Sequence, residues 1–264
     1  VQTYSSIIMA TSMKTKKKSK RNVSALQPEI DEVAENDTSL EMNSYENSYL
    51  RQEMDRFPNY SSVVIMMQVL TERDVEFIVE EAIIKKQCKQ LKLNQTKLKS
   101  PCAFILANVL SNNDNILQEL SLFDNRIDDE GVHYLAKALS VNNNNLKILD
   151  LTKNEITNVG AKYLAEMIKT NETLTTLLVA GNLIGNEGIQ ILANAIQYYS
   201  KTMIEFDFCT NELVNDSIVD SLIQLIKYSP SLKQLSLFRC NLSQNSKDKL
   251  IKMQKRKEDF ILHV

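Results

Sequence analysis

The sequence is poor in the residues that build disulfide and metal sites. Its four cysteines show no CxxC spacing, and it has only two histidines. They are Cys88, Cys102, Cys209, Cys240, His133 and His263. This set favours neither a disulfide framework nor zinc coordination, and it indicates a reducing, intracellular environment. We therefore expect a cytoplasmic chain that holds no metal ion or other cofactor.

Long apolar runs and a strong net charge are also missing. The longest apolar run, Val63 to Leu70, spans eight residues and contains Gln68, whereas a membrane helix needs about 20. A net charge of -2 gives no general attraction to nucleic acid or anionic lipid. No secretory signal is evident, because the basic run follows a weak apolar stretch instead of preceding it; the chain opens on valine, which leaves room for an upstream piece. We expect neither a membrane nor a nucleic-acid partner.

What the sequence does contain is a short unit with two periodicities. The stretch from Leu146 reads LKILDLTKNEITNVGAKYLAEMIKTNET. Leu149 and Leu151 alternate with polar neighbours, which predicts a strand. Ala161, Leu164 and Ile168 then follow the spacing of one helix face. A strand and a helix this short cannot bury their apolar sides alone, so the unit needs neighbours.

Those neighbours are further copies of the same unit. Copies begin at residues 88, 117, 146, 174, 203 and 232, so successive starts differ by 29, 29, 28, 29 and 29 residues. Regular self-similarity of this length predicts a solenoid in which each copy packs only on the next. We assign the six repeats to residues 88–249.

The common pattern, LxxLxLxxNxIxxxGxxxLxxxL, resembles the leucine-rich repeat, and its length and helical half are similar to the ribonuclease-inhibitor-like subclass. The resemblance implies an α/β solenoid (horseshoe) with a parallel sheet on the concave face and helices on the convex face. That subclass includes ribonuclease inhibitor, the sensor arrays of NOD-like receptors and the Ran GTPase-activating protein. Because the class hosts inhibitors, sensors, scaffolds and an enzyme activator, it indicates binding without selecting a partner.

Each position of the pattern has a physical role. The leucines of LxxLxL are predicted to point inward and stack on their equivalents in the next copy. An asparagine follows each of the four central strands, where its side chain can satisfy backbone groups at a tight bend. These are Asn125, Asn154, Asn182 and Asn211. Gly131, Gly160 and Gly188 fall at the helix entrance, where small size permits close approach of neighbouring copies.

The flanking segments are predicted to cap the solenoid. In residues 61–87, Thr71 to Lys85 reads as a helix with Thr71 as N-cap and Asp74 three residues on. With the apolar Val63 to Ile65 it would cover the first repeat. In residues 250–264, a last helical turn and Phe260 to Val264 would shield the final one.

Residues 1–60 are expected to form a disordered, charge-segregated tail. Residues 14–21 carry six positive charges and no acid, whereas residues 29–55 hold nine acids against one Arg51. Such blocks bury too little apolar surface to fold alone. Two alternatives stay open: the run Lys14 to Arg21 directs nuclear import or binds an anionic surface, or the blocks pair with each other or with the solenoid.

Residues between the inward leucines are predicted to form a binding surface on the concave face. Six strands at about 4.8 Å give a face roughly 29 Å wide, the scale of one protein interface. The candidate partner-binding residues are Glu119, Ser121, Phe123, Ile148, Asp150, Thr152, Thr176, Leu178, Glu205, Asp207, Cys209, Gln234, Ser236 and Phe238. Phe123 and Phe238 are candidate anchors, unless they pack against adjacent loops.

The four carboxylates on this face predict a basic protein partner; an ordinary solvated surface is the alternative. An enzyme is not expected. Asp150 and Asp207 lie about 10 Å apart by strand spacing on an open face, and no histidine is predicted near Cys209 on the sheet. We expect a monomeric, non-enzymatic interaction module.

A regulator or sensor of the GTPase-activating or NOD-like-receptor type is the second interpretation. Arg126 and Arg239 lie near the rim that a GTPase activator would use, although no local motif singles either out. The sequence contains no P-loop motif, so a nucleotide-driven switch is not expected within this chain.

Overall fold

The computed structural model describes residues 47–56, 61–112, 116–140 and 145–264. All of them belong to one compact unit, Met42–Val264. The basic run Lys14 to Arg21 and most of the predicted tail lie outside the described residues, so the expectations for them stay predictions.

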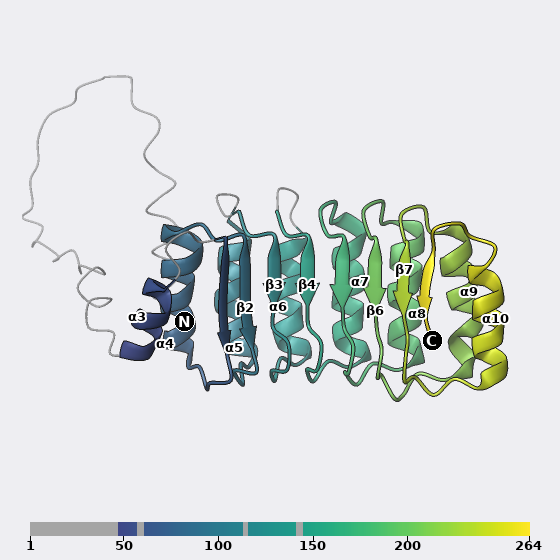
Figure 1. Ribbon diagram of the computed structural model, residues 1–264, viewed down its shortest axis with the longest axis horizontal. Helices are drawn as coiled ribbons and strands as arrows, with labels where there is room; N and C mark the ends of the chain where they lie inside the picture. Colours follow the sequence, from purple (N-terminus) through teal and green to yellow (C-terminus); the bar gives the residue numbers. More distant parts are fainter. Residues whose placement is uncertain (1–46, 57–60, 113–115, 141–144) are drawn as a thin grey trace, which may run out of the picture. The chain divides into compact units, whose positions relative to one another are not determined.

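Eight strands form one parallel sheet in sequence order, and helices lie in a second layer behind it (Figure 1). The strands are β1 (Ser62–Met66), β2 (Gln90–Asn94), β3 (Glu119–Ser121), β4 (Ile148–Asp150), β5 (Thr176–Leu178), β6 (Glu205–Asp207), β7 (Gln234–Ser236) and β8 (Ile261–His263). The helices that alternate with them are α5 (Ser100–Leu110), α6 (Asp129–Leu139), α7 (Asn158–Thr170), α8 (Asn186–Tyr198), α9 (Val219–Tyr228) and α10 (Gln244–Gln254). The sheet is open at both ends, and the predicted α/β solenoid is confirmed.

The interior is built by equivalent apolar residues of successive copies. Leu120, Leu149 and Leu177 are paired in register along the sheet and are completely buried. Phe206 continues the row in β6 and is likewise buried. Each copy therefore buries its strand and helix against its neighbours, which is how repeats too small to fold alone become stable.

The asparagines after the strands make the predicted backbone contacts. Asn154 Nδ2 donates to the carbonyl oxygens of Leu122 and Leu151 at 2.9 and 3.1 Å. Its Oδ1 accepts from the Ile127 amide at 2.9 Å, and Asn182 Oδ1 in turn accepts from the Asn154 amide. The side chains thus satisfy the buried polar groups of the bends and tie each copy to the preceding one.

Two glycines at helix entrances show why the small residue is needed. A Cβ atom on Gly160 would lie 2.5 Å from Asp129 Oδ1, and one on Gly188 would lie 2.6 Å from Asn158 Oδ1, in each case an atom of the preceding copy. Both distances are too short for a side chain, so close packing of adjacent copies requires glycine there.

The N-terminal flank contains the helix predicted from Thr71. In α4 (Glu72–Ile78) the Thr71 hydroxyl accepts from the Asp74 amide, and the Asp74 carboxylate accepts from the Thr71 amide. The helix continues as a π-helix, Val79–Lys85, instead of remaining regular. Residues Val75, Ile78, Val79, Ala82 and Ile83 are buried as expected.

The predicted tail also differs from the structure at its C-terminal end. Residues Ser48–Asp55 form helix α3, whose Leu50 and Met54 are buried. Asn47 caps this helix by accepting from the Leu50 amide, and its Nδ2 donates to Asp74 Oδ1 at 2.8 Å. Two apolar side chains at helical spacing therefore let this part of the acidic block pack on α4.

Both flanking segments extend the sheet, and the predicted six strands become eight. Strand β1 pairs with β2, and β8 pairs with β7. Phe260, just before β8, is buried. In the copy that starts at Met203, a 3-10 turn, Asp216–Ile218, precedes α9. Among the described residues, no helix is long and apolar enough to cross a membrane.

Candidate protein-binding face

The side of the sheet that faces away from the helices carries the predicted site residues, and we call it the sheet face. Strand register aligns its side chains in rows. The central row, from β1 to β8, is Val64, Lys92, Ser121, Asp150, Leu178, Asp207, Ser236 and His263. The row before it is Ser62, Gln90, Glu119, Ile148, Thr176, Glu205, Gln234 and Ile261.

On β2 to β4 the carboxylates are engaged by neighbouring side chains. Lys92 Nζ lies 2.6 Å from Glu119 Oε1, and the Gln90 side-chain amide donates to Glu119 Oε2 at 2.9 Å. Asp150 accepts from the Ser121 hydroxyl at 2.8 Å and from the Thr152 amide at 2.9 Å. Side chains of β2 and β3 therefore already bind Glu119 and Asp150, two of the four carboxylates of the predicted surface.

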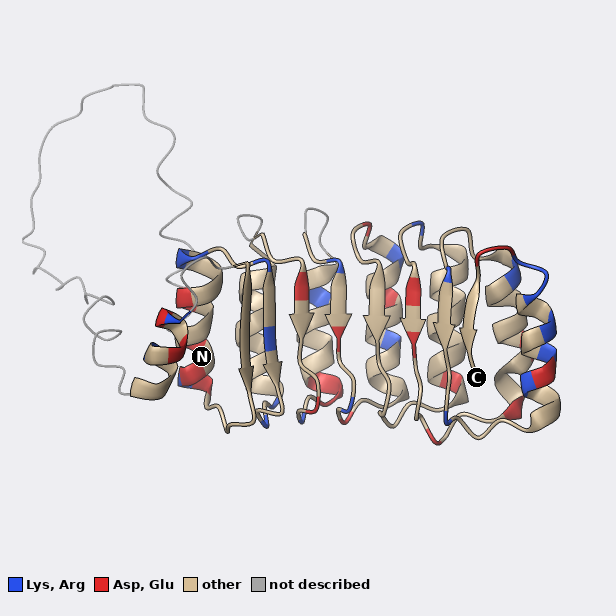
Figure 2. Cartoon of the chain, in the orientation of Figure 1, with Lys and Arg blue, Asp and Glu red and all other residues tan. Residues whose placement is uncertain are grey.

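The acids on β6 lack such a cation. Glu205 accepts from the Gln234 side-chain amide at 2.9 Å, and Asp207 accepts from the Cys209 amide at 2.8 Å. Neither forms an ion pair with any residue that the structure describes. Partial burial raises the pKa of Glu205, the Asp207 carboxylate raises it further, and His263 opposes the shift. Figure 2 shows the contrast between basic β2 and acidic β6.

His263 lies on the sheet face and was not among the site residues predicted from the sequence. Strand β8 aligns His263 with Ser236 on β7, so this histidine lies two strands from β6. The prediction that no histidine lies near Cys209 on the sheet stays a prediction. The short apolar stretch Phe260 to Val264 was the available signal for this strand.

Cys209 is nevertheless poorly suited to nucleophilic chemistry. Burial, followed by the neighbouring Asp207, raises the pKa of its thiol to about 12. Its Sγ accepts a hydrogen bond from the Phe238 amide at 3.1 Å. A thiol with such a pKa stays protonated at neutral pH, whereas the thiolate is the reactive form.

The two aromatic candidates have different surroundings. Phe123 is half-buried, and Lys153 Nζ of the adjacent copy lies 5.2 Å from its ring centroid, so it packs against a neighbouring turn. Phe238 is 52% exposed, with the Arg239 guanidinium carbon 5.6 Å from its ring centroid. Of the two, Phe238 has the free apolar surface that interface anchors use.

Two serines of the predicted surface are not available for contact. Ser121 is 3% exposed and Ser236 is 5% exposed, because larger side chains of adjacent strands cover these short ones. Ile148, Thr152, Thr176 and Leu178 are partly exposed. The accessible surface is therefore narrower than the sequence alone predicted.

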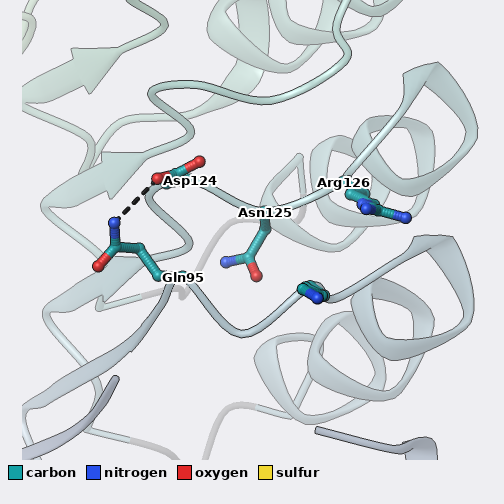
Figure 3. Close-up of a pocket in the computed structure, with 5 residues that line it drawn as sticks. Gln95, Asp124, Asn125 and Arg126 are labelled. Carbon is teal, nitrogen blue, oxygen red and sulfur yellow. Dashed lines mark hydrogen bonds between the residues drawn. The ribbon is translucent and has the colours of Figure 1, made fainter. Parts of the chain in front are cut away.

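Hollows in the structure lie beside the sheet face. One is lined by Gln95, Lys97, Asp124, Asn125 and Arg126, in the turns after β2 and β3 (Figure 3). There the Gln95 side-chain amide donates to Asp124 Oδ2 at 3.0 Å. Within the described ranges, no group of three His, Cys, Asp or Glu residues is arranged to hold a metal ion.

Three parts of the chain, residues 113–136, 142–165 and 170–193, match the family model described as Leucine Rich repeat. Together with the parallel, open sheet and its alternating helices, this match supports a leucine-rich repeat protein. The ribonuclease-inhibitor-like subclass stays a prediction.

Solved structures are similar at a low level. "Leiomodin-1 Actin-Binding Site 2 (ABS2)" is 20% identical, with a TM-score of 0.48 over 57% of this chain and 86% of that one. A second match is the "Octameric complex of Latrophilin 3 (Lec, Olf), Unc5D (Ig, Ig2, TSP1) and FLRT2 (LRR)", at 17% identity and a TM-score of 0.31, over 67% of this chain and 61% of that one. We draw no functional conclusion from either likeness. No curated protein matches the sequence.

Proposed function

We propose that this chain is a non-enzymatic protein-interaction module that binds a basic partner on the sheet face, over β5 to β8. The contact centres on Glu205 and Asp207. Phe238 and Ile261, which are 52% and 49% exposed, supply apolar contacts beside them. The rest of the predicted surface, on β2 to β4, lies at the edge of this contact.

The unpaired acid pair on β6 is the observation that carries this proposal. Two carboxylates lie two residues apart on one side of a strand, and the partly buried Glu205 has a raised pKa. Holding both charges in the free protein therefore costs free energy. A lysine or arginine of a partner would relieve that cost, because an opposite charge stabilises the ionised form.

The dimensions of the face also suit a protein. Eight strands at about 4.8 Å give a face roughly 38 Å wide, comparable with the width of a standard interface that buries about 800 Å² on each side. An exposed aromatic and an exposed aliphatic side chain next to the charges resemble the usual composition of an interface core. A small molecule would need a deeper apolar pocket.

Affinity purification with quantitative mass spectrometry tests the proposal. Full-length chain is compared with the double variant Glu205→Lys and Asp207→Lys and with the control Glu166→Lys and Asp220→Lys, which changes charge equally at exposed acids of helices α7 and α9. We expect the main protein partner to be recovered by wild type and control and lost with the β6 variant. Equal recovery by all three would refute the site.

The GTPase-activating or sensor function remains the second prediction. Arg126 and Arg239 are both exposed, and acceleration of GTP hydrolysis by a purified GTPase, lost on replacing either arginine by alanine, would establish it. Cytoplasmic location and a monomeric state likewise stay predictions.

A further inference from the structure

A second surface, separate from the sheet face, lies at the turns of the first two repeats. Two hollows there share Lys97 and Arg126 as lining residues. The second of them extends towards α4 and the start of α5, and also includes Lys99. We call this combined depression the rim hollow.

Positive charge in the rim hollow is not balanced by ion pairs. Lys97, Lys99 and Arg126 are exposed, and none of them forms an ion pair with a residue that the structure describes. Glu72 also lines the hollow. Asp124 lines it too and accepts a hydrogen bond from the Gln95 side-chain amide, so three cations face two acids there. Asp128 accepts from the Ser100 hydroxyl.

This charge is confined to one end of the solenoid. Lys97 and Arg126 occupy the same position of successive repeats, 29 residues apart, and the next repeats carry Glu155, Leu183 and Glu212 there. The basic cluster is therefore a local feature and not a property of the repeat pattern. Like charges held side by side repel each other, so an anionic occupant would stabilise the arrangement.

The backbone also differs in the first repeat. Lys97 has φ 57°, in the left-handed region, in addition to the left-handed Gln95 at the same turn. The turns after β3 and β4 have one such residue each, Asp124 and Lys153. This sparsely populated conformation at Lys97 places a lysine at the junction of the two hollows.

The second hollow also has apolar lining residues. Val69, Leu70 and Pro101 line the second hollow, and Val69 is 64% exposed. Met67, two residues earlier, is 76% exposed. A ligand that fits this lining carries negative charge on one side and an apolar group on the other.

We infer that the rim hollow binds a short acidic peptide segment of a protein partner, with a carboxylate against Lys97, Lys99 and Arg126 and an aliphatic or aromatic side chain against Val69 and Pro101. Arg126 can form two parallel hydrogen bonds with a carboxylate. This site would recognise chemistry opposite to that proposed for β6, so one chain would hold a basic and an acidic partner on different surfaces.

A displayed library of random heptapeptides, selected on the immobilised full-length chain, tests the inference. We expect enriched peptides in which an acidic residue adjoins an apolar one. The most enriched peptide, labelled with fluorescein, is then titrated by fluorescence anisotropy. We expect at least tenfold weaker binding with Lys97→Glu, Lys99→Glu and Arg126→Glu combined, and about threefold weaker binding with Val69→Ser.

The matched control combines Lys137→Glu, Lys201→Glu and Lys233→Glu, which are exposed residues that do not line the rim hollow, and it should leave the affinity unchanged. Circular dichroism and thermal unfolding show whether each variant is folded. Failure to enrich acidic peptides, or equal loss in the control, would overturn the inference. Tighter binding of polyuridylic acid with the same residue dependence would overturn the peptide assignment in favour of a polyanion.

The two proposals can be refuted independently of each other. Acidic peptides that depend on the rim hollow would remain bound to the Glu205→Lys and Asp207→Lys variant, whereas a basic partner of β6 would remain bound to the rim variant. Loss of one with retention of the other therefore identifies which proposal is wrong.

Discussion

Strands β3 and β4 on one side of the sheet face and β6 on the other carry acids at equivalent positions, but the surroundings of these acids differ. Glu119 on β3 and Glu205 on β6 occupy the same row, as do Asp150 and Asp207. Beside β3, Lys92 neutralises Glu119; beside β6, Glu205 receives only a neutral amide hydrogen bond. The same residue type at the same place in the repeat is thus part of the architecture on one side and a free charge on the other.

The largest expected effect is on partner binding. Replacing Glu205 and Asp207 by lysine should weaken binding of the basic partner about 100-fold, because removing and reversing close charge pairs at interfaces costs several kcal/mol. The matched change of Glu119 and Asp150 to lysine should weaken it much less. Titration calorimetry with the purified partner measures both, and equal losses would abolish the distinction between the two sides.

The second largest expected effect is the dependence of partner affinity on salt concentration. Raising sodium chloride from 50 to 500 mM should weaken binding by wild type about tenfold, since exposed charges are screened over a few ångströms at high salt. The Glu205→Gln and Asp207→Asn variant should respond much less. If the affinity of the wild type does not change with salt concentration, the partner does not contact the acids on β6.

For the free energy of unfolding we expect the opposite order, with Glu119 and Asp150 mattering more than Glu205 and Asp207. Changing Glu119 to Gln and Asp150 to Asn should lower the free energy of unfolding by about 1 kcal/mol, because a partly buried ion pair and charge-assisted hydrogen bonds are weakened. The same changes at Glu205 and Asp207 should have little effect or should stabilise the chain. Urea unfolding at pH 7 compares them; a larger loss for the β6 variant would contradict the assignment.

The smallest expected effect is on pH dependence. Glu205 has a raised pKa in the folded chain, so its protonated form is favoured there and folding stability falls as pH rises through that pKa. A basic partner prefers the charged form, so affinity should fall about threefold as pH drops from 7 into the acid range just above the ordinary glutamate value of about 4.3. The Glu205→Gln variant should lose this dependence; an unchanged profile would show that another group titrates.

Most of the solenoid was predictable from periodic residues. Leucine spacing predicted the strands and their burial, since apolar side chains of stacked copies can be removed from water only in one common interior. Asn154 and Gly160 were also predictable, because a tight bend needs a donor and acceptor and a close contact needs a missing Cβ. The capping box of Thr71 and Asp74 follows from the same local logic.

The flanks and the site were less predictable. Strand β8 and helix α3 match no repeat, and their burial depends on the apolar surfaces that neighbouring elements offer. Their sequences carry only short periodic signals, Phe260 to Val264 and the pair Leu50 and Met54, which are weak without a surface to pack on.

The repeat, the inward residues and the rows of the sheet face follow from spacing along the chain and could be read from the residues alone. Which face residues are accessible and which carry an unpaired charge depends on how neighbouring strands pack. Ser121 is buried and bonds Asn94, and Glu119 is paired with Lys92; in both cases the partner lies 27 positions away in the sequence. Glu205 forms no ion pair with a residue that the structure describes. Burial and electrostatic pairing depend on distances between strands, which no local pattern records.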